Sequence, residues 1–148
     1  MNKYLKLLND QKIHLVKAIA HLEYSYQKLN KIDKRIDDSD LDDELLEIWE
    51  SFSARFSRVI DLFLSRYLRS YILYNDPGFK GSLRDHINCG EKLGLIDDAN
   101  WWLELRELRN ITAHEYNDID LYHFYQRIFS KCETLINLKI KLQQTPCV

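Results

Sequence analysis

The sequence predicts an all-α protein, built as an up-and-down bundle of about five helices within a single domain, residues 1–148. Three observations support this fold class. The chain has only 4 glycines and 2 prolines, too few for the turns of a many-stranded β protein. Leu, Lys, Glu and Ile, which favour helix, are frequent. Apolar residues recur at spacings of three and four, the period of an amphipathic helix.

The first two predicted helices are long. One runs from Leu5 to near Asn30, and after a polar run the second runs from about Leu45 as far as Tyr74. The segment Asn75-Asp76-Pro77-Gly78 joins a helix-ending proline to a turn glycine and marks the clearest boundary. The apolar stripe of the first helix is Leu5, Leu8, Leu15, Ile19, Leu22, Tyr26 and Leu29, and that of the second is Leu45, Trp49, Phe52, Phe56, Val59, Phe63 and Tyr67.

Three shorter helices follow. A helix begins near Ser82, turns Leu83, Ile87 and Leu93 inward, and ends at Gly94, which suits a C-terminal cap. Asp97 or Asp98 can cap the next helix. The last helix begins between residues 118 and 120. The expected inward stripes are Trp101, Leu105, Leu108 and Thr112 on the fourth helix and Tyr122, Tyr125, Phe129, Cys132 and Ile136 on the fifth.

Charge limits the classes of partner. A formal net charge of -2 and a pI of about 6.2 argue against a protein that coats duplex nucleic acid, which needs a broad positive field. The charge is nevertheless uneven. Residues 37–50 hold eight acidic residues and no Lys or Arg, and Arg55, Arg58, Arg66 and Arg69 follow. We interpret this pattern as an acidic helix start that suits the helix dipole, followed by a basic solvated face.

Cysteine and histidine positions predict neither a disulfide framework nor a metal site. The cysteines Cys89, Cys132 and Cys147 are odd in number, and the histidines outside residues 109–116 share no ligand spacing. No cofactor is expected. The chain also has no apolar run approaching the roughly 18 residues that a membrane span needs. We therefore expect reduced thiols, a cytoplasmic location and no membrane association.

The residues with the clearest chemical potential lie between Arg109 and Tyr116. Arg109 supplies a permanently cationic planar group that suits a phosphate, and His114 can move protons near neutral pH. On one continuous helix these two side chains would point about 140° apart, whereas Asn110 and His114 would share a face. The helix must therefore end between them, or Arg109 must reach around it, if both are to serve one cleft.

Leu108-Arg109-Asn110-Ile111-Thr112-Ala113-His114-Glu115-Tyr116 resembles the RX4HXY motif of HEPN domains, specifically of HEPN toxins paired with minimal nucleotidyltransferase antitoxins. The resemblance implies a homodimer whose motifs meet in a shared cleft, and a metal-independent endoribonuclease acting on RNA. It assigns Arg109 to the scissile phosphate, Asn110 to support of the site and His114 to proton transfer. Tyr116 matches the position to which the cognate antitoxin transfers AMP to silence the toxin.

Two other interpretations of these residues remain open. The chain can be a noncatalytic partner of a small nucleotidyltransferase, whose cleft binds a nucleotide or the partner without cutting RNA. It can also be a helical adaptor in which Arg109 is a surface residue favoured by the helix dipole and His114 a cap. Arg55 and Arg58 can extend a phosphate-binding rim, although a solvated face explains them more simply.

Overall fold

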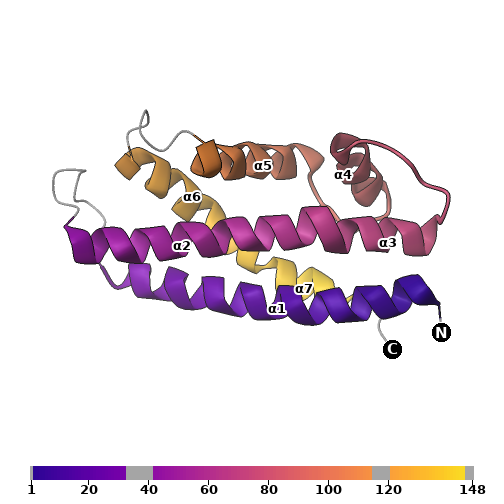
Figure 1. Cartoon of the computed structure of the whole chain (residues 1–148), viewed down its shortest axis with the longest axis horizontal. Coiled ribbons are helices and arrows are strands. Elements are labelled where there is room, and N and C mark those ends of the chain that lie inside the picture. The colour runs from indigo at the N-terminus through magenta and orange to yellow at the C-terminus, as the bar shows by residue number, and fades with distance from the viewer. Residues whose placement is uncertain (1, 33–41, 115–120, 146–148) are drawn as a thin grey trace.

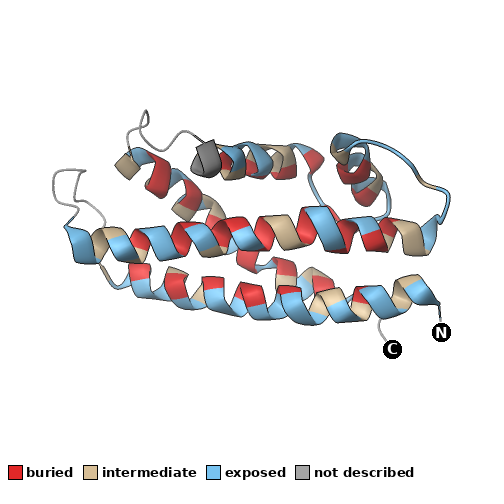
Figure 2. Ribbon diagram, viewed as in Figure 1, coloured by how far each residue is buried: buried red, intermediate tan, exposed pale blue. Residues whose placement is uncertain are grey.

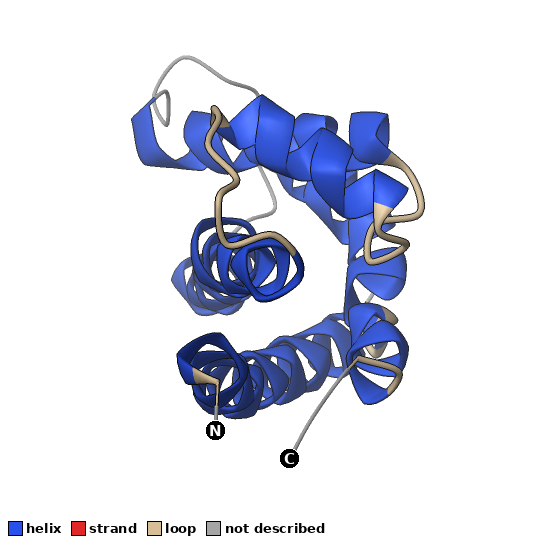
Figure 3. Cartoon of the chain, turned by 90° about the vertical axis from the view of Figure 1, so that its right-hand side faces the viewer, coloured by secondary structure: helices blue, strands red, loops and turns tan. Residues whose placement is uncertain are grey.

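The computed structural model describes residues 2–32, 42–114 and 121–145, with side chains described on α5 as far as Ile111. Within these ranges the chain forms helices and short loops, without a strand (Figure 3). The helices form five rods, which confirms the predicted all-α class. They are α1 (Lys3–Asn30), a rod of α2 (Asp43–Leu62), η2 (Phe63–Tyr67) and α3 (Leu68–Asn75), α4 (Leu83–Lys92), α5 (Ala99–His114), and α6 (Leu121–Ile136) followed by α7 (Leu138–Gln143).

The first two rods lie antiparallel along the length of the molecule (Figure 1). Their facing sides carry the predicted stripes: Leu8, Leu15 and Leu22 of α1 are fully buried, as are Phe52 and Phe56 of α2. Figure 2 shows buried residues recurring at intervals along both helices. Asn2 and Asp42 cap the two helices by accepting hydrogen bonds from backbone N–H groups of the first turn.

Aromatic rings join α2 to α6, which crosses behind it. Trp49 of α2 stacks on Tyr125 of α6 with the ring centroids 5.2 Å apart, and Tyr26 of α1 stacks on Phe129 at 4.8 Å. These contacts confirm that the Trp, Tyr and Phe stripes form the core. Because offset stacked pairs fix the direction of each ring, they set how the three helices lie relative to one another.

The second rod has a feature that its sequence pattern does not indicate. Residues 63–67 form a π turn between α2 and α3. A π turn takes one residue more than an α turn, so it changes which residues face inward. Phe63, Leu64, Tyr67 and Leu68 are all buried around it, and Phe63 stacks on Trp102 of α5 at 4.4 Å. The rod continues to Asn75, where the predicted Pro77-Gly78 break follows.

The ends of α4 and α5 have local capping residues, of which Gly94 and Asp98 were predicted. Ser82 and Asp85 form a reciprocal capping box at the start of α4. The hydrogen bonds that the Asp85 carboxylate accepts, mainly the one from the Ser82 backbone N–H, hold the pKa of Asp85 below its ordinary value. Gly94, with a φ of +82°, follows the end of α4. Asp98 is the residue that caps α5, where its carboxylate accepts from the N–H groups of Asn100 and Trp101.

Several predicted core positions differ from the structure: Trp101 and Tyr122 are half-buried, Leu93 is exposed, and Thr112 lies outside the residues whose side chains are described. Trp102, rather than Trp101, is the buried tryptophan of α5, because its ring faces Phe63 while Trp101 is half-buried. Leu93 is exposed, because α4 ends before it and the chain turns at Gly94. Leu95 and Ile96, just after this turn, are buried instead.

A buried hydrogen bond links Thr145, which follows α7, to the second rod. The hydroxyl groups of Tyr67 and Thr145 lie 2.6 Å apart, both buried, and Thr145 donates a further bond to the Leu142 carbonyl.

Among the described residues, no helix is both long enough and apolar enough to cross a membrane.

Gly90 provides a test of how closely α4 packs on the second rod. A Cβ atom at Gly90 would lie 2.7 Å from the Leu68 Cδ1 and 3.1 Å from the Ile96 Cδ1. Gly90→Ala should therefore lower the free energy of unfolding by about 1–3 kcal/mol, although alanine favours helix more than glycine does. Urea unfolding monitored by circular dichroism measures the change. Asn88→Ala, at an exposed position of the same helix, is the control and should be neutral or stabilising; a stabilised Gly90→Ala variant would contradict this packing.

Candidate functional site

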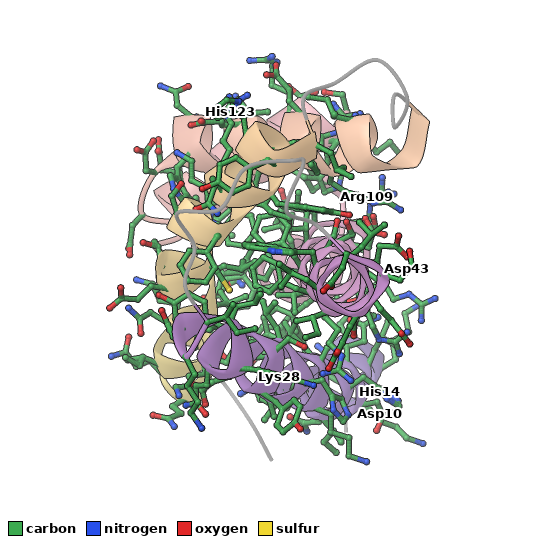
Figure 4. The ribbon with its side chains drawn as sticks, turned by 90° about the vertical axis from the view of Figure 1, so that its left-hand side faces the viewer. Asp10, His14, Lys28, Asp43, Arg109 and His123 are labelled. Atoms are coloured by element: carbon green, nitrogen blue, oxygen red, sulfur yellow. The ribbon has the colours of Figure 1, made fainter. Side chains whose placement is uncertain are left out.

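A groove of about 810 Å³ runs along the outer side of the second rod, beside α5. Figure 4 shows Arg109 in the notch between α5 and α2, on the same side of the molecule as Asp43. The residues that line the groove are mostly small or charged: Glu50, Ser53, Ala54, Ser57, Arg58, Asp61, Leu62, Ser65, Arg66 and Arg109.

Arg109 reaches this groove because the opposite side of α5 is anchored in the core. Leu105 and Leu108 are buried, and Arg109 follows on the side that faces α2. Its Nε donates to both carboxylate oxygens of Asp61, at 2.9 and 3.1 Å, and its Nη2 donates to Oδ2 at 3.0 Å. The planar guanidinium is therefore held in one orientation by a forked pair with a residue of α2.

The Asp61 carboxylate also affects the acid–base behaviour of Arg109. Its hydrogen bonds raise the pKa of Arg109 above the ordinary value, against a smaller opposing effect of burial. Arg109 is thus a fixed cation across the physiological pH range. Its side chain is 30% exposed and that of Asp61 47%, so the pair is accessible to a ligand from solvent. A ligand phosphate that bound Arg109 would share it with Asp61.

Two further arginines line the groove from the second rod. Arg58 and Arg66 are exposed, and Ser53 and Ser57 lie buried at the base of the groove on the same rod. Arg58 therefore adds positive charge to the rim of the groove, a position that the sequence allowed but did not establish. Arg55 does not, because its Nη1 donates to the His21 carbonyl and the Ser25 hydroxyl of α1, at 3.1 and 2.8 Å.

The structure places the residues of the predicted motif in different ways. Arg109 lines the groove, whereas Asn110 is exposed and is not among its lining residues. The backbone of α5 is helical through His114, so the helix does not end between Arg109 and His114. The His114 side chain and the whole of Tyr116 lie outside the described residues. The assignments of Asn110, His114 and Tyr116 stay predictions.

Asp61 is the residue of this site that the sequence motif does not reveal. It lies 48 positions from Arg109, on another helix. One signal was present in the sequence: Asp61 is the single acidic residue between Arg55 and Arg69, a stretch that otherwise carries only positive charges.

The chain as a whole matches a family described as nucleotidyltransferase substrate binding protein like, over residues 11–144. Because the match covers nearly the whole chain, the protein belongs to this family. The family confirms the predicted association with nucleotidyltransferases, while the ribonuclease-toxin subgroup stays a prediction. No curated protein and no solved structure matches the chain.

The Asp61–Arg109 pair should contribute to orientation more than to stability. Since both side chains are partly exposed, Asp61→Asn should lower the free energy of unfolding by less than about 1 kcal/mol. Urea unfolding tests this, with Asp97→Asn as the control, because Asp97 makes a single contact of 2.8 Å with Lys141 and its side chain is 83% exposed. The forked geometry predicts a larger loss at Asp61 than at Asp97. An equal or smaller loss of unfolding free energy at Asp61 would show that the forked geometry adds nothing to stability.

Proposed function

We propose that this protein is the substrate-binding partner subunit of a nucleotidyltransferase, and that its groove binds the anionic part of a nucleotide. The observation that carries the proposal is the set of three arginines, Arg58, Arg66 and Arg109, around one groove in a chain of this family. Guanidinium groups recognise phosphate through paired, planar hydrogen bonds. The volume of about 810 Å³ is within the range of small-molecule sites.

The groove also has the polar lining that such a ligand requires. Ser65 is exposed beside Arg66, and its hydroxyl can donate to a phosphate or ribose oxygen. Glu50 and Asp61 balance part of the positive charge, so the groove favours a ligand with a few negative charges over a long polyanion. We infer that the transferase itself is a small one that lacks a substrate-binding domain, since this chain would supply that domain.

Nucleotide binding tests the proposal directly. Isothermal titration calorimetry with ATP and with AMP should detect binding to the wild-type protein. Arg58→Ala with Arg66→Ala should weaken it at least about tenfold, because a hydrogen bond to a charged group contributes about 1.5–3 kcal/mol. Arg84→Ala, which removes an exposed arginine of α4 outside the groove, is the matched control. Binding that is absent, or unaffected by the double substitution, would contradict the proposal.

A second candidate function is the metal-independent ribonuclease of a toxin–antitoxin system. The observation that favours it is the position of Arg109, the first residue of the RX4HXY motif, in a groove with two more arginines. In this function Arg109 binds the scissile phosphate, Asn110 supports the site and His114 transfers a proton. AMP added to Tyr116 by the antitoxin would bring negative charge to the arginines and compete with RNA.

Cleavage of total cellular RNA by chelator-treated protein separates the two functions. If the chain is a ribonuclease, the wild type cuts RNA, and Arg109→Ala and His114→Ala each lower the rate by at least about a hundredfold. Asn88→Ala, on the exposed side of α4, should cut at the wild-type rate. Mass spectrometry first verifies that Tyr116 is unmodified. Intact RNA with unmodified wild-type protein would rule out this function and leave the substrate-binding role.

A further inference from the structure

A second cavity, of about 520 Å³, lies between the start of α5 and the helices α6 and α7. It shares no lining residue with the groove described above. Its apolar floor is formed by the buried side chains of Leu95, Trp102 and Leu138. A volume of this size is within the range of small-molecule sites. The cavity is therefore a separate space, which the proposed function does not use.

Trp101 gives this cavity an aromatic wall. Its side chain is half-buried, and its ring meets the Trp102 ring nearly at right angles, with the centroids 5.3 Å apart. Trp102 in turn stacks on Phe63 of the second rod, so the core supports the Trp101 indole from one side. A planar ligand can stack on such a ring, because the contact removes two flat apolar faces from water.

Polar groups around the apolar floor supply both hydrogen-bond donors and acceptors. Thr134 of α6 and Asn137, between α6 and α7, line the cavity from exposed positions. The amide of Asn137 can pair with a ring nitrogen and an adjacent exocyclic amino group at the same time. Asp98 caps α5 through its Oδ1, and its Oδ2 can accept a further hydrogen bond from an amino group.

The charges around this cavity do not suit a phosphate. The Nζ of Lys141 lies 2.8 Å from a carboxylate oxygen of Asp97, so these two charges offset each other. Asp98 then leaves the lining with one negative charge in excess. A phosphate is repelled by this charge, whereas the arginines of the groove attract it. The cavity therefore favours an uncharged ligand.

We propose that this cavity binds a flat heteroaromatic compound that carries an exocyclic amino group and no phosphate, such as an adenine nucleoside. The ring of the ligand stacks on Trp101. Asn137 pairs with the edge that carries the amino group, and Asp98 accepts the second hydrogen of that group. The cavity and the groove have opposite preferences for phosphate, and the inference does not rest on the proposed function.

Isothermal titration calorimetry with adenosine tests the proposal, with inosine, which has an oxygen in place of the amino group, as the comparison ligand. The wild type should bind adenosine at least about fivefold more tightly than inosine, because inosine leaves polar groups of the cavity unpaired. Trp101→Ala should weaken adenosine binding at least about fivefold through the loss of stacking, and Trp101→Phe should retain most of the affinity. Asn137→Ala keeps both tryptophans and should lower the preference for adenosine over inosine.

Two controls separate this cavity from other surfaces. Tyr24→Ala removes an exposed aromatic ring of α1 outside the cavity and should leave adenosine binding unchanged. Arg58→Ala with Arg66→Ala should leave adenosine binding unchanged while it weakens ATP binding, so a failure of the groove is distinct from a failure of the cavity. Circular dichroism verifies that each variant is helical. Adenosine binding that is absent, equal to that of inosine, unaffected by Trp101→Ala or lost with the arginines would overturn the proposal.

Discussion

Burial of the aromatic inner face of the second rod is the constraint on which the rest of the structure depends. Trp49 and Phe52 contact α6, Phe56 lies buried in the same core, and Phe63 contacts α5 through Trp102. Among the described residues, these rings join the second rod to both α5 and α6. Because large aromatic side chains bury the most apolar area, removal of this face would separate the helices that it joins.

The groove is a consequence of this arrangement. The rod that faces inward with aromatic rings faces outward with serine, alanine and charged residues, and α5 lies beside it because Leu105, Leu108 and Trp102 are buried. The forked contact between Arg109 and Asp61 then links the end of α5 to the outer side of the rod. Packing positions the two helices, and the ion pair sets the direction of the Arg109 guanidinium between them.

The sequence predicted the features that depend on neighbouring residues. The apolar stripes of α1 and the second rod, the break at Pro77, the start of α4 near Ser82 and the cap at Asp98 all follow from local periodicity or hydrogen bonding. Features that depend on contacts between distant helices were not predicted. The choice of Trp102 over Trp101, and the pairing of Arg109 with Asp61, are determined by where α5 meets the second rod.

The π turn at residues 63–67 has a consequence for how this chain can evolve. A π turn is equivalent to one residue inserted into an α-helix and absorbed without loss of the helix. The parts of the rod before and after it are therefore phased separately around the helix axis. Substitutions that retune the surface before residue 63 leave the inward register of α3 unchanged. Deletion of one residue within this turn would rotate α3 relative to α2, and would change the groove at Ser65 and Arg66 together with the core.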